Sequence, residues 1–324
     1  MINPEYVRSV RIHLGNPLSG DLWSNILESI VLILSQCTKI TKLALYYEPW
    51  YGANYSILIN QIVRMLERGT IRFFGLYSTC FMSSVRWKQK WDSEPVPNFL
   101  FNAVFGLSDC CRYLKRVEIA MDGIEGPELS NIQQNLSSIR SLTIVRAWKE
   151  GDFDRTKWAS YQHLTRLHLA YCNLAHANVV VDLVGYFQLL EELVWDVSGD
   201  ATSDSAPGPP KPGWSDLPTA LHKIRNPLRS VHFEHALDWE LCVLAQIPAV
   251  EVTIAHSDET RVENVLNLED KSFFGMKILR VLPYRDRSND SSDRLEDLCN
   301  SRKVVLLRDA MIHYPCVCCH NPYI

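Results

Sequence analysis

The chain lacks several features that would assign it to a functional class at once. Its 33 Lys and Arg against 37 Asp and Glu give a net charge of −4, so its charge implies no general attraction to nucleic acid or to anionic membranes. The longest aliphatic run, Ile30 to Leu34, is far too short to cross a bilayer, and the first residues, MINPEYVRSV, do not resemble a signal peptide. These absences predict a cytoplasmic or nuclear protein that binds neither membranes nor nucleic acid.

The sequence also lacks the short motifs on which common catalytic sites depend. It contains no GxSxG, no GxxxxGK[ST], no GxGxxG after a predicted strand and no HExxH. Single carboxylates and histidines are common, but no spacing forces two of them together. The chain is therefore predicted not to be an enzyme and to need no cofactor, with an enzyme whose site is not recognised in the sequence as the alternative.

What the sequence does contain is a repeated apolar pattern, seen most clearly in LTRLHLAYCNL, residues 164–174. There Leu164, Leu167 and Leu169 have the spacing LxxLxL. Leu167 and Leu169 alternate along a short strand and lie on one face, which a single strand cannot bury. The pattern therefore predicts that similar strands stack on either side of this one.

Degenerate copies of this spacing occur along the whole chain. The middle apolar residues Val117, Leu142 and Leu167 are 25 residues apart, Leu193 follows after 26 and Val231 after 38. Earlier copies have their inward residues at Val10 and Ile12, Leu43 and Leu45, and Phe74 and Leu76. Less regular copies surround Val252 and Ile254, Leu279 and Val281, and residues 304–307.

The segments between the predicted strands have helical periodicity. The first follows Ser19 or Asp21, either of which can cap a helix, and its apolar stripe consists of Trp23, Ile26, Leu27, Ile30 and Leu34. The second ends at Gly69, a good helix terminator, and its stripe consists of Leu58, Ile62, Met65 and Leu66. Further helices are expected at 99–107, 175–187, 215–224, 236–247, 258–268 and 292–300.

Strands that alternate with helices and run in one direction predict an α/β solenoid. Parallel strands would line a concave face, and helices would cover the convex face. We expect one domain over residues 1–324, with insertions at about 78–97 and 197–214 that interrupt the period. A Cys-rich end follows at 313–324.

The two insertions have simple interpretations and more specific alternatives. In the first, Trp87 and Trp91 alternate with basic residues in RWKQKWD, a composition that can hold phosphate and stack a base. In an acidic chain, a loop that packs its tryptophans on the solenoid is the more usual interpretation. The second is rich in Ser, Asp, Pro and Gly and is predicted to be a surface insertion, with a docking or modification segment as the alternative.

The carboxyl end contains a cluster of metal-ligating residue types in HYPCVCCH: His313, Cys316, Cys318, Cys319 and His320. A metal or thiol-redox protein that acts through this cluster is therefore the alternative function, and its ligands would be Cys316, Cys318, Cys319 and His320. Structural zinc sites usually take C-x2-C pairs from two segments, and adjacent Cys318 and Cys319 on a strand would point in opposite directions. We therefore expect reduced cysteines at an end cap, with reversible lipidation as a further alternative.

The irregular LxxLxL copies with helices between them resemble the leucine-rich-repeat superfamily, and most of all the ribonuclease-inhibitor-like, degenerate repeats of fungal F-box and related proteins. The resemblance implies a solenoid that holds another protein, often to present it to a ubiquitin ligase. An F-box would precede the repeats as a helical module, whereas Val7 already opens a predicted strand. The resemblance therefore implies a non-catalytic protein-binding scaffold, and the adaptor role in ubiquitin ligation would need an F-box from another source.

In such a scaffold, the outward residues of each strand would contact the protein partner. Tyr46 and Tyr77 belong to adjacent copies and are predicted to form an aromatic platform beside His13. A mixed charged patch is predicted further along, and it consists of Arg166, His168, Glu192, Asp196, His232 and Glu234. Its two histidines, flanked by carboxylates, would make binding depend on pH. The alternative is that both sets are ordinary solvated surface, and the chain itself is expected to be monomeric.

Overall fold

The computed structural model describes residues 4–14, 20–47, 55–78, 111–120, 138–145, 162–170, 187–196, 227–234, 247–255, 259–268, 275–282 and 293–308. Over these residues the chain is α/β, with parallel strands and few helices. It divides into two compact units, Met1–His163 and Leu164–Ile324. The predicted helices at 99–107 and 215–224, the insertion at 197–214 and the Cys-rich end lie outside the described residues. So do most of the predicted helices at 175–187 and 236–247 and nearly all of the insertion at 78–97.

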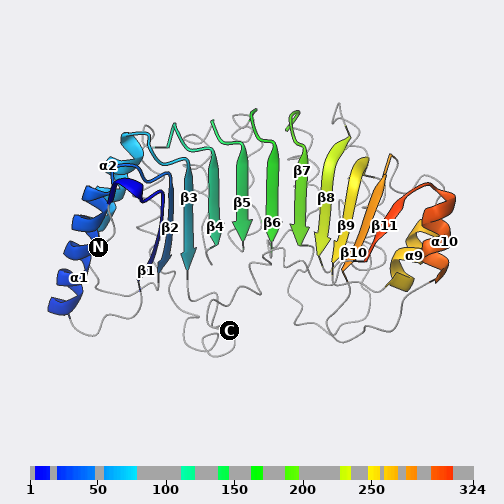
Figure 1. Ribbon diagram of the computed structural model, residues 1–324, viewed down its shortest axis with the longest axis horizontal. Coiled ribbons are helices and arrows are strands. Elements are labelled where there is room, and N and C mark those ends of the chain that lie inside the picture. The colour runs from blue at the N-terminus through cyan, green and yellow to red at the C-terminus, as the bar shows by residue number, and fades with distance from the viewer. Residues whose placement is uncertain are drawn as a thin grey trace, which may run out of the picture. The chain divides into compact units, whose positions relative to one another are not determined.

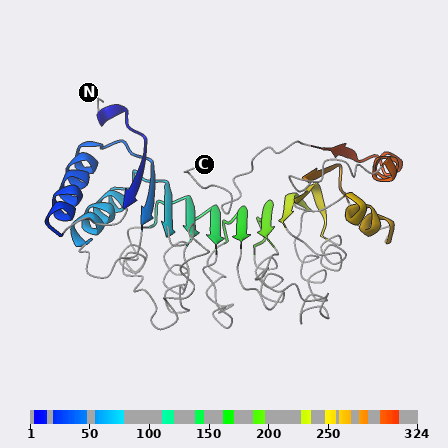
Figure 2. The same cartoon turned by 90° about the horizontal axis from the view of Figure 1, so that it is seen from below.

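The first unit has five strands and two α-helices among its described residues. In chain order the elements are a 3-10 helix at Pro4–Tyr6, β1 Ser9–Leu14, α1 Gly20–Gln36, β2 Lys42–Tyr47, α2 Ser56–Glu67, β3 Phe73–Ser78, β4 Arg116–Ala120 and β5 Ser141–Val145 (Figure 1). Each strand pairs in parallel with the next strand of the chain, from β1 to β5. Helix α1 packs against α2, as the turned view also shows (Figure 2).

The second unit has six strands and two α-helices among its described residues. These are β6 Arg166–Ala170, β7 Glu192–Asp196, β8 Leu228–Glu234, β9 Ala249–Ala255, α9 Glu259–Leu268, β10 Ile278–Leu282, α10 Asp293–Ser301 and β11 Val305–Leu307. Here too each strand pairs in parallel with the next, from β6 to β11. Helix α9 packs against α10, and α10 against β11. The helices predicted at 258–268 and 292–300 are thus confirmed.

The register of strand pairing confirms the predicted alignment of the copies. In the first unit Leu43 pairs with Val10 and with Phe74. In the second unit Val231 pairs with Leu193 and with Val252. Because side chains alternate along a strand, this register stacks the apolar residues into two columns on one face. Both columns are buried in every strand from β2 to β10 and form the core.

A backbone hydrogen bond recurs at the start of successive copies. The carbonyl oxygen of Thr41 accepts from the N–H groups of Arg72 at 2.9 Å and Phe73 at 3.1 Å. The carbonyl oxygen of Arg72 accepts in the same way from Lys115 at 2.8 Å and Arg116 at 3.0 Å. Equivalent pairs of bonds end on the carbonyl oxygens of Arg8, Lys115 and Thr165. Each acceptor follows the first apolar residue of a copy, so copies with different sequences share one backbone geometry.

The two helices of the first unit have the predicted apolar stripes, except that in α1 Ile26 is exposed and Ile30 is only half-buried. In α2 the predicted residues Leu58, Ile62, Met65 and Leu66 are all buried. In α1, Trp23, Leu27 and Leu34 are buried, whereas Ile26 is 40% exposed. Ile26 therefore lies at the edge of the buried stripe and not within it. Gly69 follows α2 in the left-handed conformation, with a φ of 69°, as expected of a helix terminator.

The cysteines of the described residues are Cys37, Cys111 and Cys299, which are buried and unbonded to each other. They pack as small apolar side chains. Within the same residues, no group of three His, Cys, Asp or Glu side chains is arranged to hold a metal ion. None of the helices described is long and apolar enough to span a bilayer.

Candidate functional site

The candidate site is the sheet face opposite the apolar columns. In the first unit this face consists of alternate strand residues, from Ser9, Arg11 and His13 in β1 to the corresponding residues of β5; we call it the first-unit face. Parallel pairing in register sets corresponding residues of neighbouring strands side by side. His13 thus pairs with Tyr46, and Tyr46 with Tyr77, as the alignment of the copies predicts.

His13, Tyr46 and Tyr77 form a continuous stack. The ring centroids of His13 and Tyr46 lie 4.4 Å apart with an interplanar angle of 3°, and those of Tyr46 and Tyr77 lie 4.6 Å apart at 11°. These separations are close to the distance between neighbouring strands, about 4.8 Å. The strand register therefore sets the spacing of the rings. His13 is exposed and the two tyrosines are half-buried.

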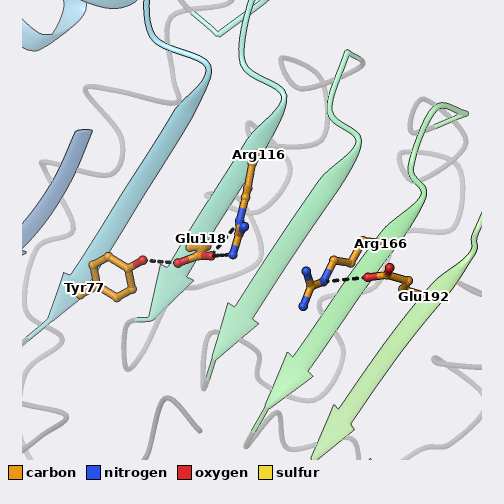
Figure 3. A network of polar contacts seen from close by, with 5 residues as sticks. All are labelled: Tyr77, Arg116, Glu118, Arg166 and Glu192. Atoms are coloured by element: carbon orange, nitrogen blue, oxygen red, sulfur yellow. Dashed lines mark hydrogen bonds and ion pairs between the residues drawn. The ribbon is translucent and has the colours of Figure 1, made fainter. Parts of the chain in front are cut away.

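Tyr77 is held by residues of β4. Its hydroxyl donates a hydrogen bond to the Glu118 carboxylate, and the other oxygen of that carboxylate accepts one from Arg116 Nε at 2.9 Å (Figure 3). Glu118 pairs in register with Gly75, two residues before Tyr77. A Cβ at Gly75 would lie 2.6 Å from Cε2 of Tyr77, so the ring leans over this glycine. The absence of a side chain at Gly75 thus allows the hydroxyl to reach Glu118.

The environment of the stack keeps both phenols protonated. Burial raises the pKa of Tyr77 far above its ordinary value, and the neighbouring Glu118 carboxylate raises that pKa further. Burial also raises the pKa of Tyr46, although the positive charge of Arg11 partly offsets this rise. Both hydroxyls are therefore hydrogen-bond donors throughout the physiological pH range.

The corresponding face of the second unit carries ion pairs between neighbouring strands. Arg166 Nε and Glu192 Oε2, from β6 and β7, lie 3.3 Å apart (Figure 3). Arg280 Nε and Glu251 Oε1, from β10 and β9, lie 2.7 Å apart. Both cations of this face that the structure describes are thus matched by carboxylates. The structure brings together Arg166 and Glu192, as the predicted charged patch requires.

The histidines of the predicted charged patch differ from each other in exposure. His168 is half-buried, with Val194 as its partner in register. His232 is only 5% exposed, so the expectation of an accessible histidine is wrong at this position. Neighbouring strands flank His232 on both sides, with Val194 and Thr253 as its partners in register. The side chains of Asp196 and Glu234 lie outside the described residues.

The contacts of Tyr77 involve functional candidates that the sequence alone did not single out. Glu118 and Arg116 belong to a copy whose outward residues are otherwise unremarkable, and Phe73 lies beneath the Arg116 guanidinium at 5.4 Å from the ring centroid. The signal that could have found Glu118 is its alignment. It occupies the same position in its copy as Gly75, which places it one strand from Tyr77.

No protein-family model matches the chain, and no curated protein matches it. The described side chains are therefore the features that indicate a function. Those of the Cys-rich end, with Cys316, Cys318, Cys319 and His320, are not among them.

Proposed function

We propose that the chain is a non-catalytic scaffold of the leucine-rich-repeat type that holds a protein partner on the first-unit face. The observation that carries this proposal is the stack of His13, Tyr46 and Tyr77 on that face. Tyrosine is favoured at protein interfaces because it combines a large, rigid apolar body with a polar tip. A row of such rings, contributed by successive strands, is a surface suited to bind another protein.

The rigidity of the stack supports the proposal. Each ring is restrained by its neighbour, and the Tyr77 hydroxyl is bonded to Glu118. A side chain that is already ordered loses little conformational entropy when a partner binds, whereas a mobile one loses about 0.5–1.5 kcal/mol. The first-unit face is therefore preorganised for binding.

The repeated geometry supports the fold that the proposal assumes. Parallel strands follow chain order in each unit, the apolar columns are continuous, and one backbone hydrogen-bond pattern recurs from copy to copy. These features support a leucine-rich-repeat solenoid, in which the strands would line the concave side and the helices would cover the convex side.

Affinity capture with quantitative mass spectrometry tests the proposal. The tagged full chain would be compared with Tyr46→Ala and His13→Ala, and with Glu28→Ala, an exposed control residue in α1. We expect the wild type and the Glu28→Ala control to recover the partner protein equally. Tyr46→Ala should recover it at about a tenth of that level or less. Thermal unfolding of each variant would confirm that it is folded. Equal recovery by folded variants would refute the proposal.

The resemblance to the repeats of fungal F-box proteins extends the proposal to the substrate-recognition part of a ubiquitin-ligase-type complex. No F-box is recognised within residues 1–324, so this role requires an F-box from outside these residues. The same capture experiment tests it, since ubiquitin-ligase subunits should then be recovered together with the partner. A partner recovered without any such subunit would contradict the adaptor role and leave the scaffold proposal intact.

A further inference from the structure

The first-unit face carries a charge opposite to that of the whole chain. Its cations are Arg11, Lys42 and Arg116, and its carboxylate is Glu118. The net charge of the chain, in contrast, is −4. Among the described side chains, the corresponding face of the second unit has two arginines, Arg166 and Arg280, and two carboxylates, Glu192 and Glu251. An excess of positive charge is therefore specific to the first-unit face.

Two of the three cations on this face are available to a ligand. Arg116 is bound to Glu118, which neutralises it. Arg11 and Lys42 are exposed, and within the described part of the chain no carboxylate forms an ion pair with either. The arginines of the second-unit face differ in this respect, since Arg166 and Arg280 are both paired. Unneutralised cations next to an aromatic row are a recognisable anion-binding feature.

Arg11, Lys42 and Tyr46 surround one small residue. Arg11 pairs in register with Ala44, and Lys42 and Tyr46 lie two residues before and after it on the same face of β2. Ala44 is buried and its side chain is short, so it does not separate these three groups. The positive charge of Arg11 acts on the Tyr46 phenol and lowers its pKa against the effect of burial. The strand register thus places Arg11, Lys42 and Tyr46 around Ala44 on this face, and Arg11 is near enough to the Tyr46 phenol for its charge to act on it.

We propose that this cluster binds the carboxylates of an acidic segment in the partner protein. Arg11 and Lys42 form ion pairs with Asp or Glu side chains of that segment, and the Tyr46 hydroxyl donates a hydrogen bond to one of them. The inference rests on the proposed function and adds the chemistry of the partner. Charge complementarity of this kind raises the rate of association and selects the partner more than it raises affinity.

Fluorescence anisotropy with the full chain and fluorescein-labelled poly-glutamate tests the inference. We expect binding that weakens when salt rises from about 0.05 M to about 0.3 M, because exposed charges are screened. Exchanging both cations in the double variant Arg11→Glu, Lys42→Glu should weaken binding about tenfold, since each exposed pair contributes modestly. The matched control is Lys39→Glu, an exposed lysine of the same unit in the turn before β2, which should change binding less than twofold.

Four comparisons make the outcome decisive. Equal effects of the double variant and of Lys39→Glu would overturn the inference, as would binding of labelled oligo-uridine in place of poly-glutamate. Labelled poly-glutamine of equal length should not bind, and binding of this uncharged peptide would also overturn the inference. If Tyr46→Ala abolishes partner capture while the double variant retains it, the proposed function stands and the acidic partner is refuted. If neither variant affects capture, the proposed function and the acidic partner are both refuted.

Discussion

At the scale of single residues, the Tyr77 hydroxyl links the aromatic stack to the charged residues of β4. Tyr77→Phe removes the hydrogen bond to Glu118 and leaves the stack with Tyr46 in place. Glu118 is only 16% exposed and would lose a donor that water does not fully replace. We therefore expect the free energy of unfolding, measured with urea, to fall by about 1–2 kcal/mol.

Tyr46→Phe is the matched control for this substitution. It makes the same chemical change in the neighbouring ring, for which the structure gives no hydrogen bond of the hydroxyl to a described residue. We expect a change in the free energy of unfolding of less than about 0.5 kcal/mol. A loss of the same size for both variants would mean that the bond to Glu118 does not stabilise the fold.

The raised pKa of Tyr77 predicts how its contribution changes with pH. In the unfolded chain Tyr77 ionises near its ordinary pKa of 10.0, whereas in the folded chain the pKa is far higher. Its contribution is therefore complete below about pH 10 and decreases as pH rises further, by about 1.4 kcal/mol per pH unit. We expect the unfolding free energy of the wild type to decrease more steeply than that of Tyr77→Phe above pH 10. Parallel curves in urea titrations would contradict the raised pKa.

The sequence predicts which residues share this site but not how they interact. His13, Tyr46 and Tyr77 could be placed together because the apolar columns fix the strand register, and a slip of one residue would expose those columns. The bond between Tyr77 and Glu118 depends on the direction in which the ring leans, and this depends on the space over Gly75. The burial of His232 depends on the side chains of two other strands. Neither effect is encoded in a local pattern.

At the scale of elements, left-handed residues mark the turns that lead into the next copy. Gly69 and Gly275 have φ values of 69° and 84°, and Lys303, two residues after the end of α10, has 58°. Because this conformation is strained for a residue with a Cβ, Lys303→Gly should raise the free energy of unfolding by about 0.5–1 kcal/mol. Lys277→Gly, at an exposed position with ordinary φ before β10, should lower it by a similar amount. Urea unfolding that shows a loss for both would contradict this account.

The same turn explains why the last copy is less regular in sequence. The pairing of Leu306 with Leu279 would place Lys303 where other copies have their first apolar residue. Val304 is buried there instead, at 7% exposure, one position later than the spacing predicts. The helical stripes and the end of α2 at Gly69 could be predicted, since they depend on local periodicity and on one glycine. That the last copy could be shifted by one residue was also predictable from its poorer fit, but the left-handed lysine at which the shift occurs was not.

At the scale of the whole molecule, the pairing of each strand with its neighbours in the chain explains why the sequence was informative. A copy cannot bury its own apolar face, so the pattern that completes one copy must recur in the next. The fold class could therefore be inferred from repeated spacing alone. The partner could not, because the outward residues are free to vary without affecting the core. The first-unit face differs from that of the second unit in these residues, although the strands of both units pair in parallel and in register.

Neighbour-only pairing predicts that damage to the core remains local. Leu43 in β2 is fully buried between Val10 and Phe74, and Leu43→Ala should lower stability by about 2–4 kcal/mol. In a linear array, this loss of stability first destabilises the altered copy and the copies next to it. We expect hydrogen–deuterium exchange to become faster for the amides of β1, β2 and β3, while β9 and β10 retain wild-type protection. Equal acceleration in all strands would show one cooperative globule, in which stability is not assembled copy by copy.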